Sequence, residues 1–182
     1  MKLAHLVTVT FASLAASVAA AQSCTPISSI PTSITTPGRY CLTQSLSSTL
    51  ASGAAISVNA ADVQIDLQGF VLDGTAAGVA STANGIFHNS LLRGFELSNG
   101  TIRGFNSALN AGVYATNPNA VILQDLRIES SRGFGLIVVG DHSIVRRVNV
   151  NRVVPQGAST NAMAIVGYGN RIRLIDNDIS DV

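Results

Sequence analysis

The chain of 182 residues is poor in charge. Asp, Glu, Lys and Arg make up 12% of the sequence, whereas an ordinary globular domain contains about 25%. The only lysine is Lys2, and beyond it ten arginines balance ten acidic residues. A surface without net charge gives no electrostatic reason to expect nucleic acid or anionic lipid as a partner. Serine, threonine and asparagine must therefore supply most of the polar surface.

Long apolar runs are absent after the first residues. Lys2 precedes an apolar stretch from Leu6 to Ala16, and Ala19-Ala20-Ala21 follows just before Gln22. This order is typical of a secretory signal peptide, so we expect residues 1–21 to be removed and the mature protein to be secreted or periplasmic. An uncleaved anchor is the alternative, but polar residues interrupt the run. No later segment reaches the about 20 apolar residues of a membrane span, which predicts no membrane attachment after cleavage.

Cysteine is scarce, since the chain has only Cys24 and Cys41. An isolated pair of this kind in an exported chain is expected to form a disulfide. A metal or redox site is the competing interpretation, but the pair lacks a CxxC spacing and has no histidine nearby. We therefore predict a Cys24–Cys41 disulfide and no metal at these residues.

What the sequence does contain is an internal repeat. The stretch "VQIDLQGFVLDG" (residues 63–74) is echoed by "FELSNGTIRG" (95–104), which aligns Leu72 with Ile102. The same apolar position recurs at Ile128, Val150 and Ile179. A second apolar series runs beside the first and consists of Ile56, Ile86, Val113, Leu136 and Ile165. Both series repeat every 22 to 30 residues and lengthen and shorten together, so insertions fall between elements that keep their phase.

The segments around these positions are predicted to be strands. They are short and alternating, as in "RVNVN" and "GLIVV", which is typical of half-buried strands. Turn-forming residues precede the first series at Asp62, Asn119, Asp141 and Asn170. Two strands per coil and about five coils predict an all-β parallel β-helix, or solenoid. The leucine-rich repeat phrase is missing, and a propeller blade needs about forty residues or more.

The domain boundaries follow from this repeat. We expect residues 22–54 to form an N-terminal cap that contains the disulfide, and residues 55–182 to form the coils. Only three residues follow Ile179, so the last coil would expose a sheet edge and the end of an apolar core, which solenoids normally cover. The coils are therefore expected to be incomplete at the C-terminus, as in a fragment of a longer protein, or to associate end to end.

Several of these stretches resemble a known superfamily. "YCLTQSLS", "AISVNAADVQIDLQGFVLDG" and "LSNGTIRGF" look like the opening coils of secreted right-handed parallel β-helix proteins, the pectin-lyase-like superfamily. The resemblance covers roughly residues 38–182 and implies a right-handed helix. It implies no single activity, because the superfamily includes polysaccharide lyases, glycoside hydrolases, epimerases and members without known catalysis.

Charge alternates down the predicted outer face. If Leu72 and its equivalents point inward, the next residue of each coil points outward, giving the column Asp73, Arg103, Glu129, Asn151 and Ser180. Three positions before the inward series lies a second column of Gly69, Asn99, Asp125, Arg147 and Asp176. Opposite charges on strands about 4.8 Å apart attract, so the alternation would fix the register. The same ribbon would also suit a groove for an acidic or neutral polysaccharide.

The candidate catalytic residues are Asp125, Arg127, Arg147, Asp176 and Asp178. The resemblance implies a carboxylate-bound calcium and a basic residue in lyases, and hard oxygen ligands suit calcium. Arg147 would lie between Asp125 and Asp176 and repel a cation, so we expect no cofactor. Asp176 and Asp178 are also the weak match to the paired acids of glycoside hydrolases, but no Gly-His-Gly phrase accompanies them. The sequence leaves open whether the protein is an enzyme.

Aromatic residues give a second candidate surface. Phe87 and Tyr114 follow the second apolar series and are predicted to form an outward column with Ile137 and Val166. Rings in this position could stack on sugars, or a loop or neighbouring chain could cover them. His88, like His142, is interpreted as a surface turn residue. The sequence therefore predicts an exported protein that binds or processes polysaccharide along its outer face, with a non-catalytic surface or adhesion module as the alternative.

Overall fold

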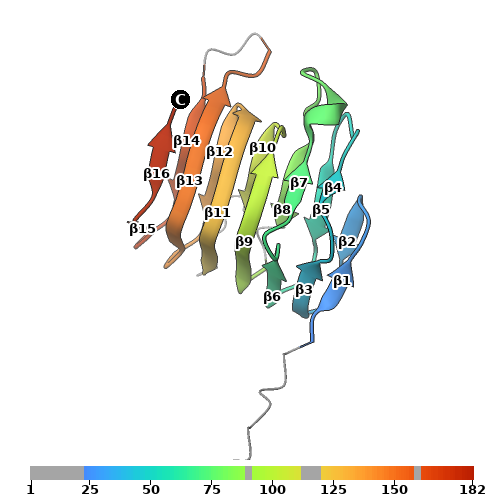
Figure 1. Ribbon diagram of the computed structural model, residues 1–182. Coiled ribbons are helices and arrows are strands. Elements are labelled where there is room, and N and C mark those ends of the chain that lie inside the picture. The colour runs from blue at the N-terminus through green and yellow to red at the C-terminus, as the bar shows by residue number, and fades with distance from the viewer. Residues whose placement is uncertain (1–22, 89–91, 112–119, 158–160) are drawn as a thin grey trace, which may run out of the picture.

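The computed structural model describes residues 23–88, 92–111, 120–157 and 161–182. Within these ranges the chain forms a parallel β-solenoid of about five turns (Figure 1), which confirms the predicted all-β fold class. The helical segment in this part of the chain is a single 3-10 turn, η1 (Thr75–Ala77). None of the described helices is long or apolar enough to cross a membrane. The predicted signal peptide, residues 1–21, lies outside the described residues.

The smaller of the two sheets, sheet B, consists of six short strands, and neighbouring strands pair in parallel (Figure 1). Its strands are β2 (Thr32–Ile34), β5 (Ala54–Val58), β8 (Asn84–His88), β10 (Ser107–Ala111), β12 (Phe134–Val139) and β14 (Met163–Tyr168). They consist almost entirely of apolar and small polar residues.

Sheet A contains the longer strands. In spatial order they are β1 (Thr25–Ile27), β3 (Gly38–Leu42), β6 (Val63–Asp66), β9 (Phe95–Arg103), β11 (Val121–Arg132), β13 (Ile144–Val154) and β15 (Arg173–Ile175). Three short strands extend it, namely β4 (Leu46–Ser47), β7 (Val71–Asp73) and β16 (Asp178–Ser180). Between the two sheets lies one continuous apolar core.

The first predicted inward column is confirmed. Leu72, Ile102, Ile128, Val150 and Ile179 are register partners on successive strands. The first four side chains are fully buried, whereas Ile179 on the last strand is 51% exposed because no further coil lies over it. The end-to-end association expected from such an edge stays a prediction.

The second inward column differs from the prediction at one position. Ile86 pairs with Leu109, and Leu109 pairs with Leu136, so Leu109 occupies the position predicted for Val113. Leu109 and Val113 are both apolar and lie four positions apart. Apolar spacing alone could not decide whether the additional turn residues of this coil come before or after strand β10. They follow it. Val113 lies outside the described residues.

The long strands of sheet A bend at left-handed residues, and one of these corners recurs in each coil from β9 onward. Asn99, Asp125, Arg147 and Asp176 all adopt left-handed backbone with φ between 50° and 58°, which non-glycine residues rarely do. The bend interrupts the alternation of faces, because Leu123 and Leu126 are both buried although they are three positions apart. The predicted second outward column therefore consists of corner residues rather than regular strand residues.

The predicted cap contributes to both sheets. Within residues 22–54, β2 pairs with β5, β3 with β6 and β4 with β7, so most of this segment forms a first coil. Cys24 and Cys41 are disulfide-bonded, as predicted, with a Cα–Cα distance of 5.8 Å. The bond joins the approach to β1 to the strand β3 that β1 pairs with.

We expect titration of the denatured, unreduced protein to find no reactive thiol. In the chain-entropy model, closing so short a loop stabilises the fold by about 3 kcal/mol, so reduction should lower the melting temperature. Titration with and without a reductant measures this directly. Two reactive thiols before reduction would contradict the disulfide.

Candidate functional site

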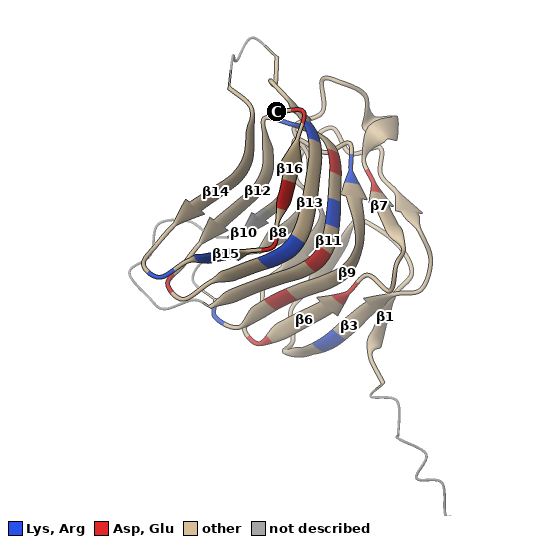
Figure 2. Cartoon of the chain, turned by 60° about the vertical axis from the view of Figure 1, so that its left-hand side comes forward, with Lys and Arg blue, Asp and Glu red and all other residues tan. Residues whose placement is uncertain are grey.

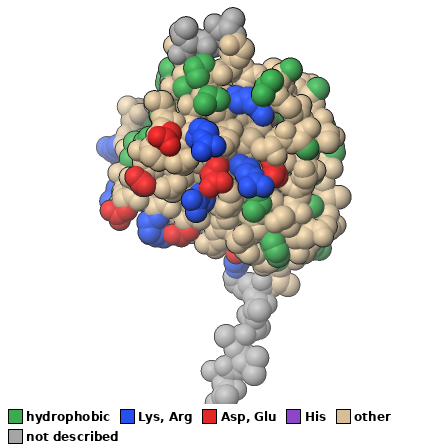
Figure 3. Space-filling model, turned by 45° about the horizontal axis from the view of Figure 1, so that its top comes forward, with side chains coloured by type: hydrophobic (Ala, Val, Ile, Leu, Met, Phe, Trp, Pro, Cys, Tyr) green, Lys and Arg blue, Asp and Glu red, His purple; other side chains and the backbone are tan. Residues whose placement is uncertain are grey.

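Among the described residues, charged side chains are confined to one side of the solenoid. No strand of sheet B contains Asp, Glu, Lys or Arg, and the charges lie on sheet A and on the turns beside it (Figure 2). Acidic and basic side chains are interleaved there rather than separated (Figure 3). The outer face of sheet A is therefore the polar face on which a functional site is to be sought.

The predicted charge column on this face is confirmed at its first two members. Asp73 and Arg103 are register partners, and Arg103 donates to Asp73 Oδ2 through Nε at 2.9 Å and Nη2 at 2.7 Å. Burial acts to raise the pKa of Asp73, but hydrogen bonds from Thr75 and Arg103 outweigh it and hold that pKa below its usual value. Glu129, the next member, instead pairs with Arg127 on its own strand at 2.5 Å.

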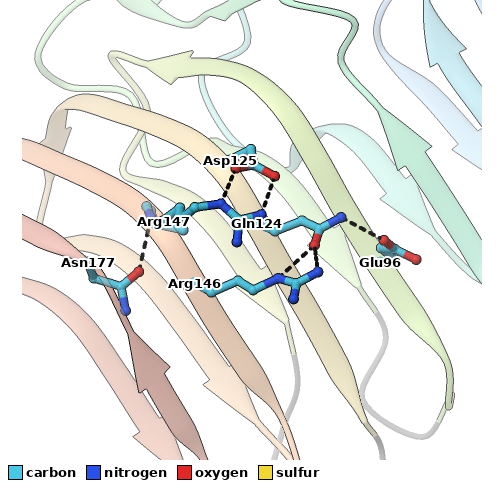
Figure 4. Close-up of polar contacts among 7 residues, drawn as sticks. Glu96, Gln124, Asp125, Arg146, Arg147 and Asn177 are labelled. Carbon is cyan, nitrogen blue, oxygen red and sulfur yellow. Dashed lines mark hydrogen bonds and ion pairs between the residues drawn. The ribbon is translucent and has the colours of Figure 1, made fainter.

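The structure brings together only part of the predicted catalytic set. Arg147 donates to Asp125 through two bonds, Nε–Oδ1 at 2.6 Å and Nη2–Oδ2 at 2.8 Å (Figure 4). The hydrogen bond from Arg147 lowers the pKa of Asp125. The pKa of Arg147 is raised, by the bond to Asp125 first and to a smaller extent by the charge of Asp176. This geometry agrees with the predicted order, in which the guanidinium lies between two carboxylates.

The remaining candidates have other partners. Asp178 accepts a hydrogen bond from Asn149 at 2.7 Å, and Asn149 stands between Arg127 and Asp178 in the register. Asn177 bonds to the backbone of β13, accepting from Val148 N at 3.0 Å (Figure 4). No three His, Cys, Asp or Glu side chains among the described residues come close enough together to hold a metal ion. This part of the face consequently forms a set of local ion pairs and hydrogen bonds.

We expect Arg147→Glu to lower the melting temperature more than Arg152→Glu does. The two arginines are matched, since both are exposed and both adopt left-handed backbone on β13. Only Arg147 stands between two carboxylates, so its replacement stacks like charges on neighbouring strands. Thermal unfolding at low salt compares the two variants. Equal decreases in melting temperature for the two variants would contradict the role assigned to Arg147. The difference between the two melting temperatures should become smaller at high salt, which screens the charges.

A second polar cluster lies nearer the N-terminal end of sheet A, where the sequence did not predict a site. It surrounds a depression of 240 Å³. One row of its lining consists of Arg39, Gln64 and Glu96, which are register partners on β3, β6 and β9. The next row consists of Asp66, Ser98 and Gln124 on β6, β9 and β11. Two adjacent rows of polar side chains on four neighbouring strands thus face one hollow.

Hydrogen bonds orient the carboxylates of this depression. Gln124 Nε2 donates to Glu96 Oε1 at 3.1 Å, and Gln124 Oε1 accepts from Arg146 Nε at 2.9 Å (Figure 4). Asp66 Oδ1 accepts from the backbone N–H of Gln68 at 2.8 Å and from Asn99 Nδ2 at 3.3 Å. Within the described residues the second oxygens, Glu96 Oε2 and Asp66 Oδ2, accept no hydrogen bond.

The predicted aromatic surface is only partly described. Phe87 is half-buried on the outer face of sheet B, beside a shallow depression of 300 Å³ that Ser57, Thr82 and Asn84 also line. Asn110 is its register partner on β10, in the place predicted for Tyr114, which itself lies outside the described residues. This difference has the same origin as the one in the inward column, where Leu109 takes the position predicted for Val113.

His88 is not the surface residue that the sequence suggested. It is only 1% exposed, and it pairs in register with the buried Val58. Its ring stacks on Phe95 with centroids 4.8 Å apart, and neither ring nitrogen has a hydrogen-bond partner in the part of the chain that the structure describes. Burial lowers the pKa of His88 to about 4. The side chain therefore acts as a neutral ring of the core, whereas His142 is exposed, in contact with Arg171.

The chain has no significant match among protein-family models, curated proteins or solved structures. Its function must therefore be argued from the geometry of the described residues.

Proposed function

We propose that the protein is an exported polysaccharide-binding β-helix whose binding face is the outer surface of sheet A. The observation that carries this proposal is the polar depression, where amides, carboxylates and a hydroxyl from β3, β6, β9 and β11 face one hollow. Sugars offer both donors and acceptors, and a row of such side chains can satisfy both. Neighbouring strands lie about 4.8 Å apart, close to the length of one sugar ring, so a chain along the solenoid axis would meet equivalent positions on successive coils.

Two further features support the proposal. The disulfide fits an exported protein, since such bonds persist in oxidising compartments. Residues 38–182 resemble secreted right-handed β-helix proteins of the pectin-lyase-like type, many of which act on polysaccharides. The fold by itself would carry no function.

Binding is favoured over cleavage of the polysaccharide. A glycoside hydrolase needs a carboxylic acid with a raised pKa to protonate the leaving group. The shifted carboxyl groups of this chain, Asp73, Asp125 and Asp141, all have lowered pKa values, because each accepts hydrogen bonds that favour its ionised form. These three carboxyl groups are therefore unsuited to general acid catalysis.

The test is retardation of the mature protein in native gels that contain soluble glycans, with pectate, alginate and neutral glycans in separate gels. Gln64→Ala and Gln124→Ala should weaken binding to the retained glycan several-fold, because each removes a hydrogen-bonding group from the depression. Ser33→Ala on β2 of sheet B is the matched control and should bind like the wild type. Equal retention by all variants would place binding elsewhere.

The same glycans, incubated with the protein, report on catalysis. Unsaturated products that absorb in the ultraviolet would indicate a lyase, and new reducing ends alone would indicate a hydrolase. Either result would replace the binding proposal with an enzymatic one.

A further inference from the structure

We infer that the depression on sheet A takes an uncharged glycan rather than a polyuronate, an inference that rests on the proposed function. Its lining contains two carboxylates, Asp66 and Glu96, against one guanidinium, Arg39. The other members of the two rows are uncharged, namely Gln64, Ser98 and Gln124. The hollow is therefore polar and slightly acidic, which disfavours a ligand with a carboxylate on every sugar.

The carboxylate geometry fits hydroxyl groups. Asp66 and Glu96 each hold one oxygen in hydrogen bonds from the protein, from Gln68 and Asn99 in one case and from Gln124 in the other. The second oxygen of each carboxylate can accept a hydrogen bond from a sugar hydroxyl. Charge-assisted bonds of this kind are stronger than neutral ones. A uronate would place an acceptor, and a like charge, where a donor is needed.

The neighbouring cations are already engaged. The Arg146 guanidinium donates to Gln124 Oε1 and Arg147 donates to Asp125 (Figure 4). Arg103 donates to Asp73. A polyuronate would have to compete with these partners to gain an ion pair. Arg173 occupies the row of Glu96, but β11 and β13 separate the two strands, so its charge lies away from the hollow.

Arg146 is a positioning residue for the Gln124 amide. Its bonds to Gln124 Oε1 fix the amide so that the NH₂ group faces Glu96. Removing the guanidinium lets the amide turn, which costs Glu96 its donor. We expect Arg146→Met to weaken glycan binding although the side chain does not line the depression, and Arg146→Lys, which keeps a donor, to restore part of the affinity.

The experiment measures dissociation constants by titration calorimetry in EDTA, with soluble neutral β-glucan and galactan oligosaccharides against oligogalacturonate and oligoguluronate. The double variant Asp66→Asn, Glu96→Gln keeps the shape and removes both charges. Asp141→Asn, in the turn between β12 and β13 and outside the depression, is the matched control. Far-ultraviolet circular dichroism and melting temperature establish that each variant is folded.

The wild type should bind at least one neutral oligosaccharide and bind the uronates at least tenfold more weakly. The double variant should lose about tenfold in affinity for the neutral ligand and narrow its discrimination against uronates, while Asp141→Asn behaves like the wild type. Tighter binding of a uronate than of any neutral ligand, in EDTA or only with added Ca²⁺, would overturn the inference and leave the proposed function standing. Binding of neither class would overturn the proposed function itself.

Discussion

Acidification from pH 7 to pH 4 is expected to lower the free energy of unfolding by about 3 kcal/mol through His88 alone. Burial lowers the pKa of this histidine from 6.5 to about 4. Above pH 6.5 the ring is neutral in both states. Between pH 6.5 and 4 only the unfolded chain takes up the proton, so stability falls progressively across that window and levels off below it.

The variant His88→Leu isolates this effect. Leucine keeps an apolar side chain in the column with Val58 and removes the titration, so urea unfolding between pH 7 and 4.5 should show a much flatter dependence on pH. His142→Gln is the matched control, because His142 is exposed, and its dependence should follow the wild type. A His88→Leu protein that loses stability as steeply as the wild type would show that other groups cause the acid sensitivity. Asp73 and Asp125 have lowered pKa values, so their protonation lowers the free energy of unfolding mainly below pH 4.

Replacement of Gly135 by alanine is expected to destabilise the protein by about 2 kcal/mol, as overpacking of a dense core does. Gly135 lies on β12, in a buried column of small residues that comprises Ala55, Gly85, Ala108, Gly135 and Ala164. A Cβ atom at residue 135 would stand 2.3 Å from the backbone oxygen of Ala164 and 3.1 Å from Val150 Cγ1. Backbone cannot move aside as a flexible side chain does, so the strands must separate.

Gly167→Ala is the matched control on the adjacent strand β14. Its Cβ would meet only the Ile172 side chain, at 3.2 Å from Cδ1, and that terminal methyl group can rotate away. Urea unfolding of the two variants at pH 7 should therefore show a large loss for Gly135→Ala and little change for Gly167→Ala. Similar values for both would mean that the small-residue column does not limit the approach of the strands.

The register of the fold could be predicted because it depends on a strong local signal. Leu72, Ile102, Ile128 and Val150 each lie in an alternating segment, and burial of an apolar side chain fixes the face on which it points. Opposite charges at Asp73 and Arg103 reinforce the same register. Both features repeat along the chain and need no knowledge of distant contacts.

Positions after a bend could not be predicted in this way. A left-handed residue such as Asp125 adds one exposed residue to the strand. The strict alternation of buried and exposed side chains therefore fails at that point. The position of Leu109 could not be predicted for a related reason. Apolar spacing gives the length of a coil but does not show how many of its turn residues lie before the strand and how many lie after it. His88 was misjudged because a histidine at a strand end is usually polar surface, and only its register with Val58 shows that it points inward.

The depression was missed because its members come from four strands and form no motif within any of them. A signal was nevertheless present in the sequence. The segments "VQID" and "FELS" place polar side chains at the same two alternating positions of successive coils, and "VILQ" in the next coil repeats the second of them at Gln124. This pattern predicts polar rows on the outer face. What they cannot show is the hydrogen-bonded chain from Arg146 through Gln124 to Glu96, since it depends on side-chain reach across strands.

The left-handed corners also make each coil an interchangeable module. Asp125 and Arg147 occupy the same corner of consecutive coils, and buried residues, Leu126 and Val148, follow them in equivalent positions. Deleting residues 126–147 would join Asp125 to Val148 and excise one full circuit of the chain. Every remaining side chain would keep its former face, because the junction preserves the corner. Duplicating that segment would lengthen the solenoid by the same unit, so the number of coils can vary without a change in cross-section.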